Sequence, residues 1–90
     1  MKYSLANKII LITGASSGIG KALAFQLSEN EPKAILILIA RNKEKLLETA
    51  ETCKNKGIQT YFFIADLADA LESEKVCCEI KNNIGIPDII

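Results

Sequence analysis

A glycine-rich segment is the part of this chain whose residue types and spacing could do chemistry. It spans residues 13–20, and Gly14, Gly18 and Gly20 follow the spacing G-x-x-x-G-x-G. An apolar run over residues 9–12 precedes it, and an amphipathic stretch follows. A strand, a glycine turn and a helix N-terminus in this order bring backbone N–H groups together, and the helix dipole adds roughly half a positive charge. The segment therefore predicts a cradle for the pyrophosphate of a dinucleotide.

Each glycine of this turn has a distinct predicted role. Gly14 allows a tight exit from the strand, Gly18 lets the backbone approach a phosphate, and Gly20 allows the helix to pack closely on the sheet. Ser16 and Ser17 add hydroxyl donors, and we interpret them as phosphate ligands because the chain has no histidine to activate a serine nucleophile. The alternative is an ordinary turn, since turns use glycine freely.

The elements that must position this turn alternate between strands and helices. Continuous apolar runs predict buried parallel strands at residues 9–13, 34–40 and 59–65, with the start of a fourth strand at 87–90. Helices are predicted over residues 18–30, from a cap at Asn42 to about Lys56, and from an apparent capping box at 69–72 to a stop at Gly85. This order predicts half of a doubly wound α/β sheet with strand order 3-2-1-4.

The periodicity of each helix also predicts which residues face the core. For the first helix we expect a stripe of Ile19, Leu23 and Leu27 beside Ala22, with Lys21, Ser28 and Glu29 on other faces. For the second and third helices we expect stripes of Leu46, Leu47, Ala50 and Cys53, and of Val76, Ile80 and Ile84.

Composition limits the class of protein. Ninety residues make at most one domain, and 11 basic residues balance 11 acidic ones, so no overall charge favours nucleic acid or an anionic membrane. The longest apolar run, residues 34–40, is far shorter than the ~20 residues of a membrane helix. The first eight residues lack the apolar core of a signal peptide. We therefore expect a cytoplasmic protein with no nucleic-acid or membrane partner.

The cysteines predict neither a disulfide framework nor a metal site. The chain has three cysteines, Cys53, Cys77 and Cys78, and no two of them form a C-x-x-C pair. It has no histidine. We expect reduced thiols. Adjacent Cys77 and Cys78 leave a strained vicinal disulfide as an alternative that no other feature favours.

The segment Thr-Gly-Ala-Ser-Ser-Gly-Ile-Gly resembles the cofactor motif of the classical short-chain dehydrogenases/reductases. Residues 40–42 are similar to the end of that family's second strand. Asp66-Leu67 resembles the acidic pair that closes the third strand and contacts adenine, and residues 86–90 resemble the approach to its Asn-Asn-Ala-Gly motif. The resemblance implies a Rossmann-type fold, and it implies cofactor binding by Gly14, Ser16, Ser17, Gly18, Ile19, Gly20, Arg41, Asn42, Asp66 and Leu67.

The end of the second predicted strand favours NADP over NAD. An NAD-selecting unit carries an acid about twenty residues past the glycines, which binds the ribose hydroxyls. Here that place holds Ala40 beside Arg41, and no carboxylate lies between Glu31 and Glu44. Arg41 can bind a 2′-phosphate through charge-assisted hydrogen bonds. Two alternatives stay open: Arg41 only ends the strand in solvent, and Asp66 only caps the next turn.

No residue of this chain matches the catalytic groups that the resemblance implies. The family's Asn, Ser and Tyr-x-x-x-Lys lie beyond the fourth strand, whereas Tyr3 is followed four places on by Asn7, and Tyr61 by Ala65. We therefore expect residues 1–90 to be a partial NAD(P)-binding Rossmann domain, truncated within the fourth strand and marginally stable alone. The full-length relative is expected to be a homo-oligomer.

Two functional hypotheses follow. In the first, the chain is the NADP-binding N-terminal portion of an oxidoreductase that transfers hydride between NADP(H) and a carbonyl or alcohol. In the second, it is a truncated, non-catalytic nucleotide-binding fragment or gene remnant. A Rossmann-type methyltransferase or epimerase is disfavoured by the glycine spacing and by Ala40-Arg41.

Overall fold

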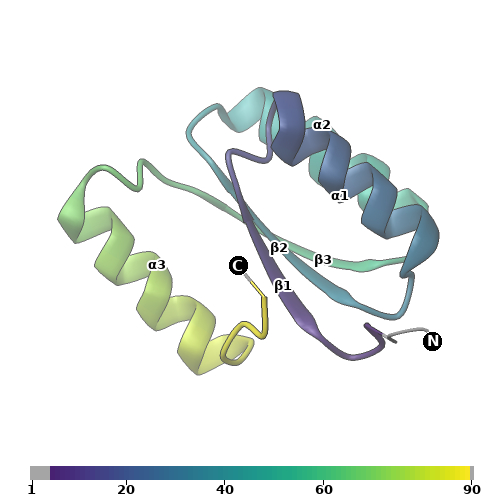
Figure 1. The fold of residues 1–90 in the computed structure, drawn as a ribbon. Helices are drawn as coiled ribbons and strands as arrows, with labels where there is room; N and C mark the ends of the chain where they lie inside the picture. Colours follow the sequence, from purple (N-terminus) through teal and green to yellow (C-terminus); the bar gives the residue numbers. More distant parts are fainter. Residues whose placement is uncertain (1–4, 90) are drawn as a thin grey trace.

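The computed structural model describes residues 5–89 and shows strands and helices in strict alternation (Figure 1). Every predicted strand and helix before residue 85 is present, with bounds within one or two residues of expectation. In chain order the elements are β1 (Ile9–Thr13), α1 (Gly18–Asn30), β2 (Ile35–Ala40), α2 (Lys43–Asn55), β3 (Gln59–Ile64) and α3 (Ala70–Asn83).

The three strands form one parallel sheet with β2 at its centre, in the order β1-β2-β3. A parallel bridge between Ile10 and Ile89 places the C-terminal segment on the other edge of β1. The Asp88 carboxylate reinforces this pairing by accepting a hydrogen bond from Ile9 N–H at 2.9 Å. The described residues therefore follow the predicted order 3-2-1-4; Ile90 of the expected fourth strand lies outside them.

Helices α1 and α2 cover one face of the sheet and α3 covers the other (Figure 1). Strand β2 is buried on both faces. Its residues alternate between two hydrophobic clusters: Leu36 and Leu38 pack under α1 and α2, while Ile37 and Ile39 pack under α3. This two-sided burial explains why β2 is a continuous apolar run without alternation.

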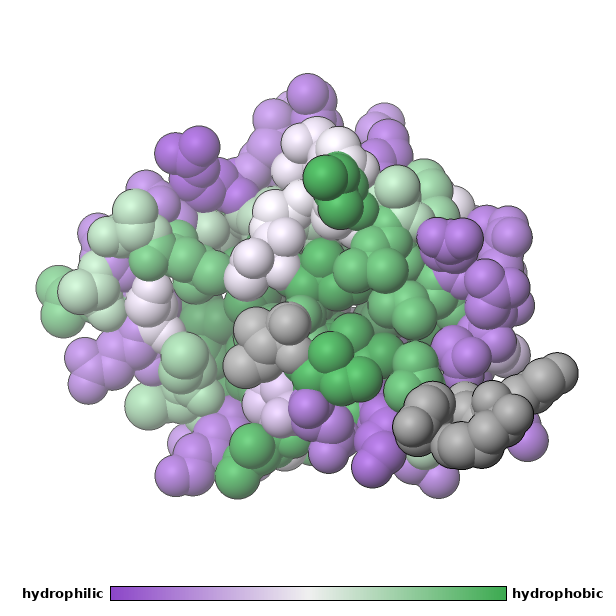
Figure 2. Space-filling model, in the orientation of Figure 1, coloured by the Kyte–Doolittle hydropathy of each residue, from purple (hydrophilic) through white to green (hydrophobic). Residues whose placement is uncertain are grey.

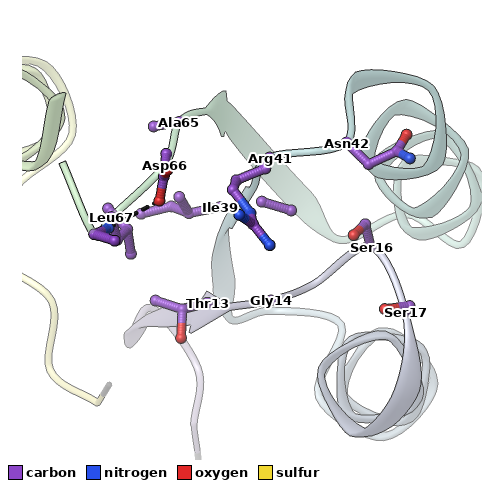
Figure 3. Close-up of a pocket in the computed structure, with 12 residues that line it drawn as sticks. Thr13, Gly14, Ser16, Ser17, Ile39, Arg41, Asn42, Ala65, Asp66 and Leu67 are labelled. Atoms are coloured by element: carbon purple, nitrogen blue, oxygen red, sulfur yellow. Dashed lines mark hydrogen bonds between the residues drawn. The ribbon is translucent and has the colours of Figure 1, made fainter.

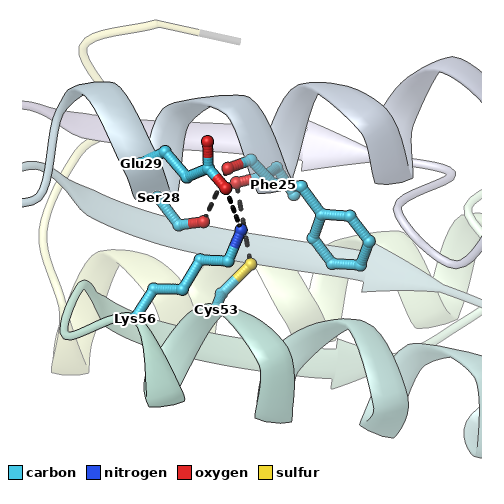
Figure 4. Close-up of polar contacts among 6 residues, drawn as sticks. Phe25, Ser28, Glu29, Cys53 and Lys56 are labelled. Atoms are coloured by element: carbon cyan, nitrogen blue, oxygen red, sulfur yellow. Dashed lines mark hydrogen bonds and ion pairs between the residues drawn. The ribbon is translucent and has the colours of Figure 1, made fainter.

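Small side chains allow α1 and α2 to approach each other closely (Figure 4). The Cys53 thiol, buried between the helices, donates a long hydrogen bond to Ala24 O at 3.6 Å. The Ser28 hydroxyl donates to Phe25 O at 2.7 Å, which satisfies it in the interior. Burial raises the pKa of the Cys53 thiol.

A charged pair joins the same helices at the surface (Figure 4). Lys56 Nζ donates to Glu29 Oε1 at 2.6 Å, and this hydrogen bond lowers the pKa of the Glu29 carboxyl. The ammonium groups of Lys21 and Lys56 also lie 5.7 and 5.6 Å from the centre of the Phe25 ring. An ion pair at an exposed site contributes little to stability.

The predicted apolar stripe of α1 is wrong at three of its four residues, and only Leu27 packs on the core as predicted. Ile19 is 88% exposed and Leu23 45%, and Ala22 is exposed as well, whereas Ser28 is buried. The reason is that α1 packs against both the sheet and α2, so its inner face is made of small residues such as Ala24 and Ser28.

The stripe of α2 needs one correction, and that of α3 is confirmed. Leu47 is 38% exposed, whereas Thr49 is buried, and its hydroxyl is satisfied by donating to Lys45 O at 3.1 Å within the helix. In α3, Val76 and Ile80 are buried and half-buried Ile84 packs on the same cluster.

None of the helices between residues 5 and 89 is long and apolar enough to cross a membrane. Cys53, Cys77 and Cys78 are free thiols, the first buried and the other two exposed.

Candidate cofactor-binding site

A cleft of about 710 Å³ lies where the carboxyl ends of β1, β2 and β3 meet (Figure 3). Ligands bind at this edge in doubly wound sheets. Three short segments line the cleft, one following each strand: Thr13, Gly14, Ser16 and Ser17; then Ile39, Ala40, Arg41 and Asn42; then Ala65, Asp66, Leu67 and Ala68.

The glycines after β1 are required by the backbone path. Gly14 and Gly18 have φ of +64° and +57°, a region that side chains other than glycine rarely adopt. A Cβ on Gly20 would lie 2.5 Å from Gly14 O and 3.1 Å from Thr13 O. The close approach predicted at Gly20 is therefore present, but its partner is the backbone of the turn at the end of β1.

The N-terminus of α1 opens at the cleft with its backbone donors unused by side chains. Ser17 is the N-cap residue, yet its side chain makes no capping hydrogen bond, and the first turn holds no acidic residue. The helical bonds begin with Lys21 N–H, which donates to Ser17 O at 3.3 Å. The N–H groups of residues 18–20 therefore have no acceptor within the helix. This arrangement suits an anion.

The segment after β2 supplies a cation to the cleft. Arg41 is exposed at the end of the strand, and its guanidinium points into the cleft (Figure 3). The preceding residue, Ala40, is buried and uncharged. Asn42 caps α2, since its Oδ1 accepts a hydrogen bond from Lys45 N–H at 3.0 Å. Arg41 is the one cationic residue among those that line the cleft.

The segment after β3 forms the opposite wall. Asp66 Oδ1 accepts a hydrogen bond from Ala68 N–H at 2.9 Å, and Asp66 O accepts one from Asp69 N–H at 3.0 Å. The structure therefore contains the turn cap that the alternative interpretation assigned to Asp66. A carboxylate has several lone pairs on two oxygens, so this bond does not use up its capacity as an acceptor.

The capping box predicted at residues 69–72 is only half formed. Asp69 Oδ1 accepts from Leu71 N–H and Glu72 N–H at 2.9 and 3.1 Å, as an N-cap should. The Glu72 carboxylate does not return to Asp69 N–H, because Asp66 O already accepts that donor. Glu72 Oε1 instead accepts from Asp66 N–H at 3.4 Å.

The structure brings most of the predicted site residues together. Those that line the cleft are Gly14, Ser16, Ser17, Arg41, Asn42, Asp66 and Leu67, whereas Gly18, Ile19 and Gly20 lie in the first turn of α1 and are not part of the lining. Sequence reasoning assigned no role in the site to three of the residues that line the cleft, Ile39, Ala65 and Ala68. Ile39 could have been found from its place one residue before the end of β2.

Comparison with known proteins identifies the family of this chain. The model of the short chain dehydrogenase family matches residues 8–90. Estradiol 17-beta-dehydrogenase 11 of Macaca fascicularis is 36% identical over 89 residues, which are 99% of this chain and 29% of that protein. The 3-oxoacyl-[acyl-carrier-protein] reductase FabG of Staphylococcus aureus is 36% identical over 83 residues, 92% of this chain and 33% of that protein.

Solved structures share the fold. L-sorbose reductase of Gluconobacter frateurii, complexed with NADPH and L-sorbose, matches with a TM-score of 0.87 and 30% identity, over 99% of this chain and 34% of that one. A putative D-mannonate oxidoreductase of Haemophilus influenza with bound NAD matches with a TM-score of 0.85 and 26% identity, over 97% and 31%. The chain thus spans about a third of the length of these proteins. With the family model covering residues 8–90 and a Rossmann-type half-sheet carrying the glycine turn, the chain belongs to the short chain dehydrogenase family of oxidoreductases.

Proposed function

We propose that the cleft binds NADP(H). The chain is then the NADP-binding N-terminal portion of an oxidoreductase that transfers hydride between NADP(H) and a carbonyl or alcohol substrate. The observation that carries this proposal is the unfilled N-terminus of α1 facing a cleft whose one lining cation, Arg41, follows β2. Relatives of known structure hold NADPH in one case and NAD in another.

The turn after β1 fits a pyrophosphate. The positive φ of Gly14 and Gly18 and the missing Cβ of Gly20 keep the turn close to the start of α1. The free N–H groups there and the hydroxyls of Ser16 and Ser17 are all donors, and no acid in the first turn repels a phosphate. Ile19 contributes its backbone N–H, because its side chain points away into solvent.

The segment after β2 selects the cofactor. The Arg41 guanidinium offers a planar fork of donors for a 2′-phosphate, and Ala40 presents no carboxylate to the ribose. Asn42 lies beside it as the N-cap residue of α2. On the opposite wall, Asp66 and Leu67 contact the adenine.

When bound, NADP(H) supplies or accepts the hydride. The residues of this chain bind and orient the dinucleotide, and the proposal assigns none of them a catalytic role, because none matches Tyr-x-x-x-Lys. The cytoplasmic location and the homo-oligomeric state of the full-length protein stay predictions.

Titration of the purified protein with NADPH and NADH tests the proposal. We expect tighter binding of NADPH, seen as a larger ligand-induced rise in melting temperature. Arg41→Ala should weaken NADPH binding by about tenfold and leave NADH almost unchanged, because it removes a charge-assisted hydrogen bond. Ala40→Asp should shift the preference toward NADH. Lys43→Ala, which removes an exposed cation outside the lining, is the matched control.

Two results would contradict the proposal. Failure of both dinucleotides to bind would overturn the site itself. Binding with a preference that neither Arg41→Ala nor Ala40→Asp narrows would overturn the selection of NADP while leaving the dinucleotide site intact.

A further inference from the structure

One peptide group in the wall after β3 is held at both of its ends. The carbonyl of Leu67 accepts a hydrogen bond from Ser73 Oγ at 2.8 Å. The N–H of Ala68, in the same peptide group, donates to Asp66 Oδ1 at 2.9 Å. A trans peptide is planar, and its C=O and N–H point in opposite directions. Fixing the carbonyl toward α3 therefore fixes the direction in which the N–H meets the Asp66 carboxylate.

The Ser73 hydroxyl comes from the first turns of α3, which is itself anchored. Ser73 N–H donates to Asp69 O at 3.0 Å, and the Asp69 side chain caps the helix through Leu71 N–H and Glu72 N–H. Ser73 is half-buried and lies six residues beyond the carbonyl that it binds. Its hydroxyl thus transmits the position of a capped helix to a loop that has no regular secondary structure.

The other end of the loop is anchored to the sheet. Ala65 N–H donates to Ala40 O at 3.0 Å, which continues the pairing of β3 with β2 by one residue. Between this bond and the helix, four hydrogen bonds hold residues 66–68. Two close the turn, from Ala68 N–H to Asp66 Oδ1 and from Asp69 N–H to Asp66 O at 3.0 Å, and two involve α3 side chains, the Ser73 bond and a longer contact of 3.4 Å from Asp66 N–H to Glu72 Oε1. Of the two bonds that come from α3 side chains, that of Ser73 is the shorter.

We propose that Ser73 is a positioning residue for recognition of the adenine base. It acts through the 67–68 peptide to aim the Asp66 carboxylate and the Leu67 side chain into the cleft, although Ser73 itself does not line the cleft. The inference rests on the proposed function, because it needs the dinucleotide with its adenine at this wall. An aimed carboxylate accepts a hydrogen bond from the 6-amino group of adenine and is repelled by the 6-oxo group of hypoxanthine.

The test compares affinities for NADPH and for its hypoxanthine analogue, deamino-NADPH, in the purified protein. We expect the unaltered protein to prefer NADPH by about tenfold, and Ser73→Ala to reduce this ratio by about threefold, in proportion to one lost hydrogen bond. Ser73→Thr keeps the hydroxyl, and we expect it to prefer NADPH over deamino-NADPH as strongly as the unaltered protein does. A role in stability alone would lower the melting temperature but leave the ratio unchanged.

Two further variants make the outcomes distinct. Asp66→Asn should reduce the ratio at least as much as Ser73→Ala. Thr52→Ala removes a hydroxyl-to-carbonyl bond of 3.0 Å on α2, far from this wall in sequence, and should not change the ratio. The inference is overturned if Ser73→Ala keeps the full ratio, or if Asp66→Asn does. Absence of NADPH binding by the unaltered protein would instead overturn the proposed function.

Discussion

The N-terminus of α1 differs from those of α2 and α3. All three helices start just after a strand, at the same edge of the sheet. Asn42 and Asp69 cap α2 and α3 with side-chain hydrogen bonds, and each of these helices has a glutamate in its first turn. Ser17 makes no such bond, and the first turn of α1 has no acid.

The same structural feature, the first turn of a helix, can therefore either stabilise the fold or offer hydrogen-bond donors to a ligand. A capped, acidic first turn satisfies its own backbone donors and complements the helix dipole, which stabilises the helix. An uncapped first turn leaves donors and dipole for an external anion. The described part of the chain therefore has two helix starts capped by their own side chains and one, that of α1, without a side-chain cap, and substitutions should affect the two kinds of start differently.

The largest expected effect comes from Gly20→Ala, which breaks the start of α1 itself. Its new Cβ would meet backbone atoms of Gly14 and Thr13, which cannot move without opening the turn. We expect a loss of about 3 kcal/mol in the free energy of unfolding, at the upper end for overpacking, together with loss of NADPH binding. Urea unfolding and NADPH titration measure the two quantities.

Gly57→Ala is the control for this change. Gly57 has φ of +95° but open space around it, and it lies at the end of α2, away from the cleft. It should cost about 1 kcal/mol in stability and leave NADPH affinity intact. If Gly20→Ala proved no more harmful to binding than Gly57→Ala, the close approach in the turn would have no functional importance.

The next largest effect is expected at the cap of α3. Asp69→Ala removes an acceptor for two backbone donors, Leu71 N–H and Glu72 N–H, and should lower the free energy of unfolding by about 1.5 kcal/mol. Asp69→Asn keeps an acceptor at the same place and should recover most of this loss. Equal stability of Asp69→Ala and the unaltered protein in urea would show that this cap does not stabilise α3.

A smaller effect is expected at Asn42, which accepts a single bond, from Lys45 N–H. Asn42→Ala should cost about 1 kcal/mol. Asn42→Asp preserves the cap but adds a carboxylate beside Arg41, so stability should be retained while NADPH affinity falls relative to NADH. Urea unfolding measures the capping role of Asn42, and titration with NADPH and NADH measures its effect on cofactor binding. If Asn42→Asp lost both stability and NADPH affinity, the two roles would not be separable.

The sequence predicted the elements well because their signals are local. The apolar run at residues 34–40 identified β2, and Asn42 and Gly57 marked the two ends of α2. The location of the cleft was predictable once the strands were identified, because in parallel sheets the residues after each strand meet at one edge.

The prediction of which side chains are buried failed where burial depends on the residues that pack against them in the folded chain. Ser28 and Thr49 are polar by type but buried, because their hydroxyls bond carbonyls of their own helices. Ile19 and Leu23 fit a helical stripe but face outward, since α1 turns small residues toward α2 and the sheet. The bond from Ser73 to Leu67 O likewise depends on the three-dimensional path of a loop, for which no spacing rule exists.

The smallest effect on stability is expected at Ser17, and this is where the comparison between helix starts is sharpest. Because its side chain caps nothing, Ser17→Ala should change the free energy of unfolding by less than about 0.5 kcal/mol. The same change should weaken NADPH binding, since a hydroxyl donor to the phosphate is lost. Ser17 would then behave in the opposite way to Asn42 and Asp69, where alanine costs stability first.

Ser17→Asp should move the two quantities in opposite directions. A carboxylate at the N-cap can accept from the first turn and complement the dipole, so it should raise stability by up to about 1 kcal/mol. It would also fill the anion site and repel the pyrophosphate, so NADPH affinity should fall by more than tenfold. Unfolding in urea without ligand and NADPH titration of the same sample measure both. A Ser17→Asp protein that is less stable yet binds NADPH normally would contradict the view that α1 begins at a vacant anion site.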